Sequence, residues 1–171
     1  MTGHRDQADD LGERLERAVR AREDGRHEEA RTLLLALRAD HPDDATVAYQ
    51  TAWVHDALGL EREAVPHYER ALAGEGLTDA ERQGALVGLG STYRVVGRHD
   101  DAVATLRAGV AAYPDHGALR TFLALALHST GRHTEATGLL LTLLAETSAD
   151  PGITAYRRAI ARYAEDPDRT W

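Results

Sequence analysis

The sequence contains nearly the same hexapeptide three times: GRHEEA at residues 25–30, GRHDDA at 97–102 and GRHTEA at 131–136. A degenerate fourth copy, GLEREA, lies at residues 59–64. The four glycines are separated by 34, 38 and 34 residues, and an alanine follows each of them five residues later. A fixed period of this length indicates an array of repeated structural units.

Two helical patterns flank each glycine. Ala-rich amphipathic runs precede the glycines at 8–23, 43–57, 78–95 and 116–129, and further runs follow them at 27–39, 61–73, 99–112 and 133–146. We expect each glycine to end the first helix of a pair in the left-handed conformation. The acidic residues that follow favour the start of the next helix through its dipole. The repeat unit is therefore expected to be a helix hairpin.

A ninth helix is expected after the fourth hairpin. Asp150 is placed to cap it and Pro151 to occupy its first turn. Its apolar residues Ile153, Tyr156, Ile160 and Tyr163 recur at helical spacing, which predicts a stripe that covers the open face of the last hairpin. The 38-residue step holds a four-residue insertion within residues 74–83, and either Thr78 or Asp79 is expected to cap the helix behind it.

The composition excludes several classes of function. The chain has a net charge of −8, which argues against binding to nucleic acid. It contains no cysteine, lysine or asparagine, so thiolate chemistry, Schiff bases and the lysine of a phosphate-binding loop are absent. No apolar run is long enough for a membrane span, and no signal peptide is visible. We therefore expect a cytoplasmic protein with no membrane or nucleic-acid partner.

The landmarks of the third repeat allow a family comparison. Leu89-Gly90, Tyr93, Gly97, Ala102 and Pro114 stand at signature spacings of the tetratricopeptide repeat (TPR), and the other copies share part of this pattern. The chain resembles this family over about residues 8–148, and it is similar to small stand-alone bacterial TPR proteins. The resemblance implies an all-α fold, a right-handed α-solenoid of four TPR hairpins plus a C-terminal capping helix.

The expected organisation follows from the repeat spacing. It comprises a disordered N-terminus (1–7), four repeats (approximately 8–42, 43–77, 78–114 and 115–148), a capping helix (149–164) and a tail (165–171).

The histidines were considered as metal ligands. His27, His99 and His133 lie on successive repeats, about 10 Å or more apart, whereas all ligands of one ion must lie within about 2.2 Å of it. We therefore expect them to be half-buried rings that pack near the turns. His55 and His67 lie on paired helices and can approach each other, but no HExxH motif accompanies them. A metal-dependent enzyme using this pair is the weaker alternative, and we expect no catalytic residue, no cofactor and no metal.

The resemblance also implies a concave groove lined by the first helix of each hairpin. Tyr49 and Trp53 are four residues apart there, so they can form one aromatic platform; a core position for Trp53 is the equally weighted alternative. Since chaperone-binding TPR domains hold a carboxylate with lysine and asparagine, that activity is not expected here. Transferred onto this chain, the groove positions are Leu15, Val19, Arg22, Glu23, Tyr49, Trp53, Asp56, Val87, Ser91, Arg94, Thr121, Leu125 and His128.

These observations predict a non-catalytic scaffold or adaptor that binds a protein partner, as a peptide or helix, in the concave groove. Burial of the partner's apolar side chains on Tyr49, Trp53 and Leu125 would provide affinity. Arg94 and Asp56 would set the polarity of the groove. Homo-oligomerisation through a self-associating assembly module is the alternative from a different class.

Overall fold

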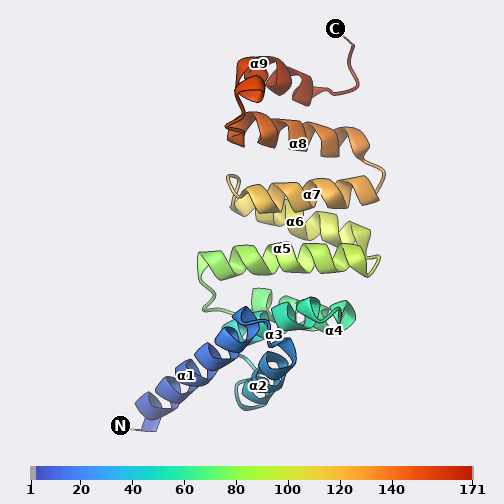
Figure 1. Ribbon diagram of the computed structural model, residues 1–171. Helices are drawn as coiled ribbons and strands as arrows, with labels where there is room; N and C mark the ends of the chain where they lie inside the picture. Colours follow the sequence, from blue (N-terminus) through green and yellow to red (C-terminus); the bar gives the residue numbers. More distant parts are fainter. Residues whose placement is uncertain (1–2, 171) are drawn as a thin grey trace. The chain divides into compact units, whose positions relative to one another are not determined.

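All regular structure in the part of the chain that the computed structural model describes, residues 3–170, is α-helical (Figure 1). The nine helices in this part are α1 (Gly3–Glu23), α2 (His27–Asp40), α3 (Ala45–Ala57), α4 (Glu61–Ala73), α5 (Asp79–Val95), α6 (His99–Ala112), α7 (Gly117–Ser129), α8 (His133–Thr147) and α9 (Pro151–Glu165). The prediction of an all-α fold with four hairpins and a capping helix is confirmed. Helix α1 includes residues 3–7, for which disorder is expected, and residues 1–2 lie outside the described part.

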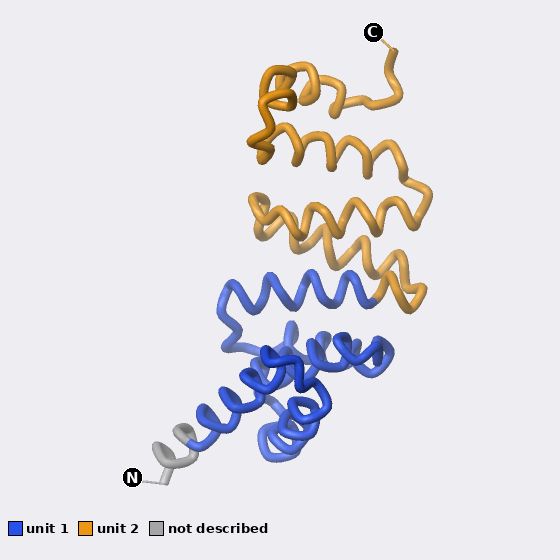
Figure 2. Tube along the Cα trace, in the orientation of Figure 1, with its two compact units in different colours: residues 1–92 blue, residues 93–171 orange. Residues whose placement is uncertain are grey.

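The chain divides into two compact units, residues 1–92 and residues 93–171 (Figure 2). In the first unit α1 packs on α2, α2 on α3 and α3 on α4. In the second unit α6 packs on α7, α7 on α8 and α8 on α9. Helix α5 begins in the first unit, and its last residues belong to the second.

The four repeated glycines close the first helix of each hairpin by the same hydrogen bonds. Gly25, Gly59, Gly97 and Gly131 all have positive φ, between 72° and 86°. At the first turn the Arg26 amide donates to the Ala21 carbonyl (2.8 Å) and the Gly25 amide to the Arg22 carbonyl (3.0 Å). The same pair of bonds recurs at the other three glycines. This is the Schellman arrangement, which requires a left-handed residue and explains the glycine.

The rest of the hexapeptide builds the start of the second helix. In three of the hairpins the arginine after the glycine precedes the helix and forms an ion pair with the acidic residue three positions on. These pairs are Arg26–Glu29 (2.5 Å), Arg98–Asp101 (2.6 Å) and Arg132–Glu135. None of these three second helices has a side-chain cap at its start. The acidic residue in the first turn instead favours the positive end of the helix dipole, and its ion pair holds the arginine that precedes the helix. The alanine of each copy is buried.

Glycines on α5 allow two tyrosines of the first unit to pack against that helix. A Cβ atom at Gly84 would collide with the Tyr49 hydroxyl, and one at Gly88 would collide with the ring of Tyr68. Tyr68 is almost fully buried, and its ring lies 6.5 Å from that of Tyr49. This part of α5 is thus a helix surface shaped to receive aromatic rings.

Helix α9 begins as expected but packs by a different face. The Asp150 carboxylate accepts a hydrogen bond from the Ile153 amide (3.0 Å), and Pro151 occupies the first turn. The predicted stripe is wrong in its tyrosines, because Tyr156 and Tyr163 are 69% and 49% exposed. The helix instead approaches α8 closely at Gly138, where a Cβ atom would lie 2.6 Å from the Ala164 carbonyl oxygen. Such close backbone contact favours small residues and leaves the larger rings at the flank.

Candidate interaction surface

A hollow of about 380 Å³ lies on the first unit, between α1, α3 and the start of α5. Leu15 and Val19 of α1, two of the transferred groove positions, supply its apolar side chains. Thr46 and Gln50 of α3 and the carboxylates of Glu16 and Glu81 complete much of the lining, together with Gly12 and Arg20. The sequence analysis did not single out these polar residues, because their helical positions flank the transferred groove positions.

Trp53 lies at the surface beside this hollow. Its side chain is 36% exposed, and the Arg22 guanidinium lies 4.3 Å from the centre of its ring, within the range of a cation–π interaction. Arg22 also donates a hydrogen bond to the Gln50 side chain (2.8 Å), and Gln50 lines the hollow. The other flank of Trp53 faces His27, whose ring centre is 6.1 Å away. Trp53 is therefore a held, partly exposed ring, and not a core residue.

Tyr49 and Trp53 do not form the expected aromatic platform. Tyr49 makes its ring contact with Tyr68, whereas Trp53 makes its own with His27. Burial raises the pKa of Tyr49, which agrees with a ring directed towards α5. The two side chains diverge because Gly84 leaves room for Tyr49 on that helix. Trp53 alone remains as the exposed aromatic group of this surface.

Asp56 takes part in a polar network inside the first unit. The Thr92 hydroxyl lies 2.8 and 3.0 Å from its two carboxylate oxygens and 2.7 Å from the Gly88 carbonyl oxygen. Tyr68 is also hydrogen-bonded to Asp56. Desolvation raises the pKa of Asp56, although these hydrogen bonds act in the opposite direction. The carboxylate is thus engaged by neighbouring helices of its own unit.

The remaining groove positions fall in different settings. In the first unit Val87 and Ser91 are half-buried, and Glu23 is exposed and paired with Arg22 at 3.2 Å. In the second unit Arg94 is half-buried and Leu125 is 41% exposed. The Thr121 hydroxyl donates to the Gly117 carbonyl of its own helix (2.9 Å). His128 is exposed and contacts His133.

The histidines of the repeated motif do not share one environment. His27 and His99 are half-buried, in agreement with the sequence prediction, but His133 is exposed. His55 and His67 approach each other as predicted, with ring centres 5.1 Å apart. The Nδ1 atom of His55 lies 2.7 Å from the Thr51 carbonyl oxygen, and burial lowers the pKa of His67 to about 4. Among residues 10–170, whose side chains the structure describes, no group of three or more His, Cys, Asp or Glu is arranged around a possible metal position.

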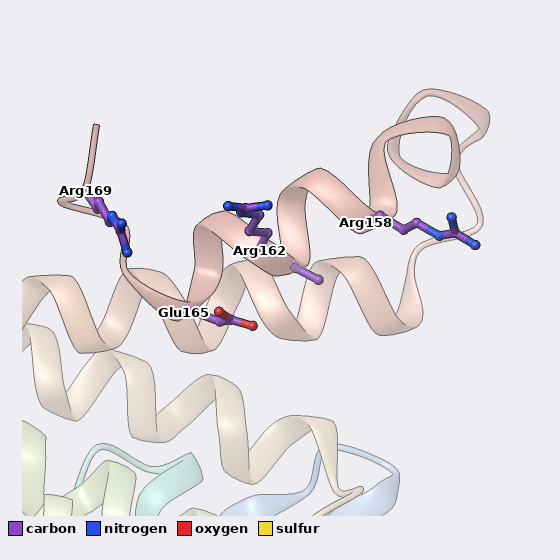
Figure 3. A pocket seen from close by; sticks show the side chains of 5 residues that line it. Arg158, Arg162, Glu165 and Arg169 are labelled. Atoms are coloured by element: carbon purple, nitrogen blue, oxygen red, sulfur yellow. The ribbon is translucent and has the colours of Figure 1, made fainter. Parts of the chain in front are cut away.

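A second hollow, of about 720 Å³, is open to solvent along α9 and the segment after it (Figure 3). Arg158, Arg162 and Arg169 line it together with Ala161 and Glu165. Figure 3 shows Arg158 and Arg162 along one helix, with Arg169 on the following segment. Because most of its lining side chains are charged and it lies outside the transferred groove positions, this hollow does not define the candidate site.

Charge is distributed unequally between the two units. Residues 1–92 contain 19 acidic residues and 11 arginines, a net charge of −8, whereas residues 93–171 contain nine of each. The entire net charge of the chain therefore belongs to the unit that contains the hollow and Trp53. Such a surface attracts cationic partners and repels anionic ones.

Repeated helix hairpins with an apolar hollow and a held aromatic ring define the class of helical-repeat interaction proteins. The family model described as tetratrico peptide repeat matches residues 45–166, so the protein belongs to the TPR family. It is a TPR protein-interaction module, and the fold implies protein partners. None of the helices within residues 3–170 is both long and apolar enough to cross a membrane.

Several solved structures share the fold. A MamA RS-1 double mutant is 19% identical, with 91% of this chain and 94% of that chain covered and a TM-score of 0.68. PilF of Pseudomonas aeruginosa is 20% identical, with coverages of 95% and 71% and a TM-score of 0.67. MamA AMB-1 is also 20% identical, with coverages of 85% and 78% and a TM-score of 0.67. No curated protein matches the sequence significantly.

Proposed function

We propose that the protein is a non-catalytic adaptor whose first unit binds a cationic amphipathic segment of a partner protein. One observation carries this proposal: the hollow combines an apolar side formed by Leu15 and Val19 with two carboxylates against a single arginine, Arg20, in a unit of net charge −8. An apolar side chain of the partner would fill the hollow. Lysine or arginine residues beside it would face Glu16 and Glu81.

Trp53 extends this surface beyond the hollow. Gln50 connects the two, because it lines the hollow and accepts a hydrogen bond from the arginine that stacks on Trp53. A held aromatic ring loses little conformational freedom on binding, so it is suited to anchor a second apolar side chain. The roles of Arg94, Leu125 and the other groove positions of the second unit stay predictions, as do self-association and a cytoplasmic location.

The proposal is tested with two amphipathic helical peptides as probes. They share the same leucine pattern, and one carries lysine wherever the other carries glutamate. We expect fluorescence anisotropy at low salt to show binding of the lysine peptide and at least tenfold weaker binding of the glutamate peptide. Raising the salt concentration should weaken the first interaction, because exposed charges are screened.

Matched variants locate the binding site. Val19→Ser removes apolar surface from the hollow and should weaken binding of the lysine peptide about tenfold, a loss of about 1.4 kcal/mol. Leu35→Ser is the control, because Leu35 is 40% exposed on α2 and does not line the hollow. Equal binding of the two peptides, or equal effects of the two substitutions, would contradict the proposal.

A further inference from the structure

Two exposed histidines lie together at the turn of the fourth hairpin. His128 is in the last turn of α7, and His133 is the first residue of α8. Their ring centres are 4.5 Å apart, the ring planes are tilted by 58°, and the two Nδ1 atoms are 3.1 Å apart. Both residues belong to the second unit, so this pair is independent of the surface proposed to bind a partner.

The backbone holds the two side chains at this separation. The Gly131 amide donates to the His128 carbonyl (3.1 Å), and the Arg132 amide donates to the Leu127 carbonyl (3.0 Å). These bonds form the same helix-ending turn that recurs in the other hairpins. The distance between the imidazoles is therefore set by a structured turn rather than by a flexible loop.

The geometry fits two ligands of one metal ion. A zinc–nitrogen bond measures about 2.0–2.1 Å, and tetrahedral coordination then places two ligand nitrogens roughly 3.3 Å apart. The observed 3.1 Å differs from this separation by an amount that a small side-chain rotation supplies. Neutral imidazole is a common ligand of divalent transition metals, and the exposure of both rings leaves space for water ligands.

The other hairpins lack this pair. At the positions equivalent to His128 and His133 they carry Arg22 and His27, Asp56 and Glu61, or Arg94 and His99. Only the fourth of the four repeated turns places two imidazoles five residues apart. The first and third turns show in addition that arginine fits the first position without disturbing the hairpin.

We propose that His128 and His133 form a two-histidine site for a divalent transition-metal ion such as Zn²⁺. Two water molecules complete its coordination, because no group of three or more metal-ligating side chains occurs among the described residues. A site with two protein ligands binds more weakly than the three- and four-ligand sites of catalytic and structural zinc. The site therefore takes up metal reversibly and joins the ends of α7 and α8.

The experiment is a calorimetric titration of the full chain with Zn²⁺, followed by NMR of the histidine side chains. We expect one site of micromolar affinity, with the ring signals of His128 and His133 shifted together. His128→Arg recreates the arrangement of the first and third turns, so it should remain folded while binding falls at least tenfold. His133→Gln should have the same effect on binding. Circular dichroism checks that both variants are folded.

His99→Gln is the matched control, because His99 occupies the position of His133 in the third hairpin but has arginine in place of its partner. It should leave zinc affinity unchanged. Unaltered binding in both His128→Arg and His133→Gln would overturn the proposal. So would a titration of the wild type in which these two histidines do not respond, since the pair would then be only a hydrogen bond between imidazoles.

Discussion

The first and second units are built from the same hairpin turn but differ in their interiors. Among the described residues all the buried polar side chains belong to the first unit: Gln50, Thr51, His55 and Thr92. Buried positions of the second unit are occupied mainly by alanine, leucine and valine, with Tyr93 at its start. The two units thus share the turn that repeats along the chain, but they differ in the side chains buried between their helices. The first unit should be more sensitive than the second to pH and to changes in side-chain volume.

The largest expected effect comes from filling the space at Gly88. Gly88→Leu would collide with the Tyr68 ring, which is buried and hydrogen-bonded to Asp56 and so has little freedom to move. We expect the free energy of unfolding of the first unit to fall by about 3 kcal/mol. Urea unfolding followed by Trp53 fluorescence measures it, with Trp171 replaced by phenylalanine so that a single tryptophan remains.

Gly12→Leu is the control for this substitution. Gly12 lies on a helix, and no atom would come within 4 Å of its added Cβ. This variant should be as stable as the wild type or slightly more stable, because leucine favours helix more than glycine does. If both variants lost a similar amount of unfolding free energy, steric fit at α5 would not explain why the first unit is more sensitive to side-chain volume than the second.

An intermediate effect is expected from His67 when the pH is lowered. Burial first, and then the positive charges of His55 and Arg38, lower the pKa of His67 to about 4 in the folded state. The unfolded chain binds a proton near the ordinary value of about 6.5, so stability is complete above this pH and is lost as the pH falls towards 4. We expect this group to contribute a loss of about 2 kcal/mol.

The measurement compares urea unfolding at neutral pH and near pH 4.5 for the wild type and His67→Gln. The variant cannot bind the proton, so its stability should fall less over this interval. If His67→Gln and the wild type lose the same free energy, the buried imidazole does not produce the pH sensitivity of the first unit.

The smallest effect is expected at an ion-pair cluster of the second unit. Glu135 accepts from Arg107 (2.5 Å) and also pairs with Arg132, but all three side chains are more than 40% exposed. Glu135→Gln should therefore lower the free energy of unfolding by only about 0.5 kcal/mol, and less at high salt. Thermal unfolding at two salt concentrations tests this. A loss above about 2 kcal/mol would mean that surface charge is as important as the polar interior of the first unit.

The sequence predicted the repeat because local chemistry determines it. Glycine at a positive φ and alanine at a buried contact act within one turn or one helix pair, so they recur at a fixed period. Seven of the eight hairpin helices lie close to the predicted ranges, and α1 begins earlier than expected. The arginine–acid ion pair of the motif was also readable from its three-residue spacing, but the sequence analysis assigned the acidic residue to the helix dipole alone.

The sequence does not determine how one helix face meets another. Tyr49 and Trp53 have the spacing of a pair, yet Tyr49 packs at Gly84 beside Tyr68, and Trp53 lies with Arg22 instead. The tyrosines of α9 share a stripe with its isoleucines, yet close contact at Gly138 places them at the flank. Helical periodicity identifies neighbours on one helix, but it does not show which neighbouring helix has room for them.

By itself the sequence determined the all-α class, the four hairpins, the capped ninth helix and the net charge of −8. Only the tertiary structure decided that Glu16 and Glu81 border a hollow, that Asp56 is engaged by Thr92 and that His128 meets His133. The physical reason is the distance along the chain over which the interactions act. Turns and helices follow from interactions over a few residues, whereas hollows and side-chain pairs depend on how closely separate helices approach.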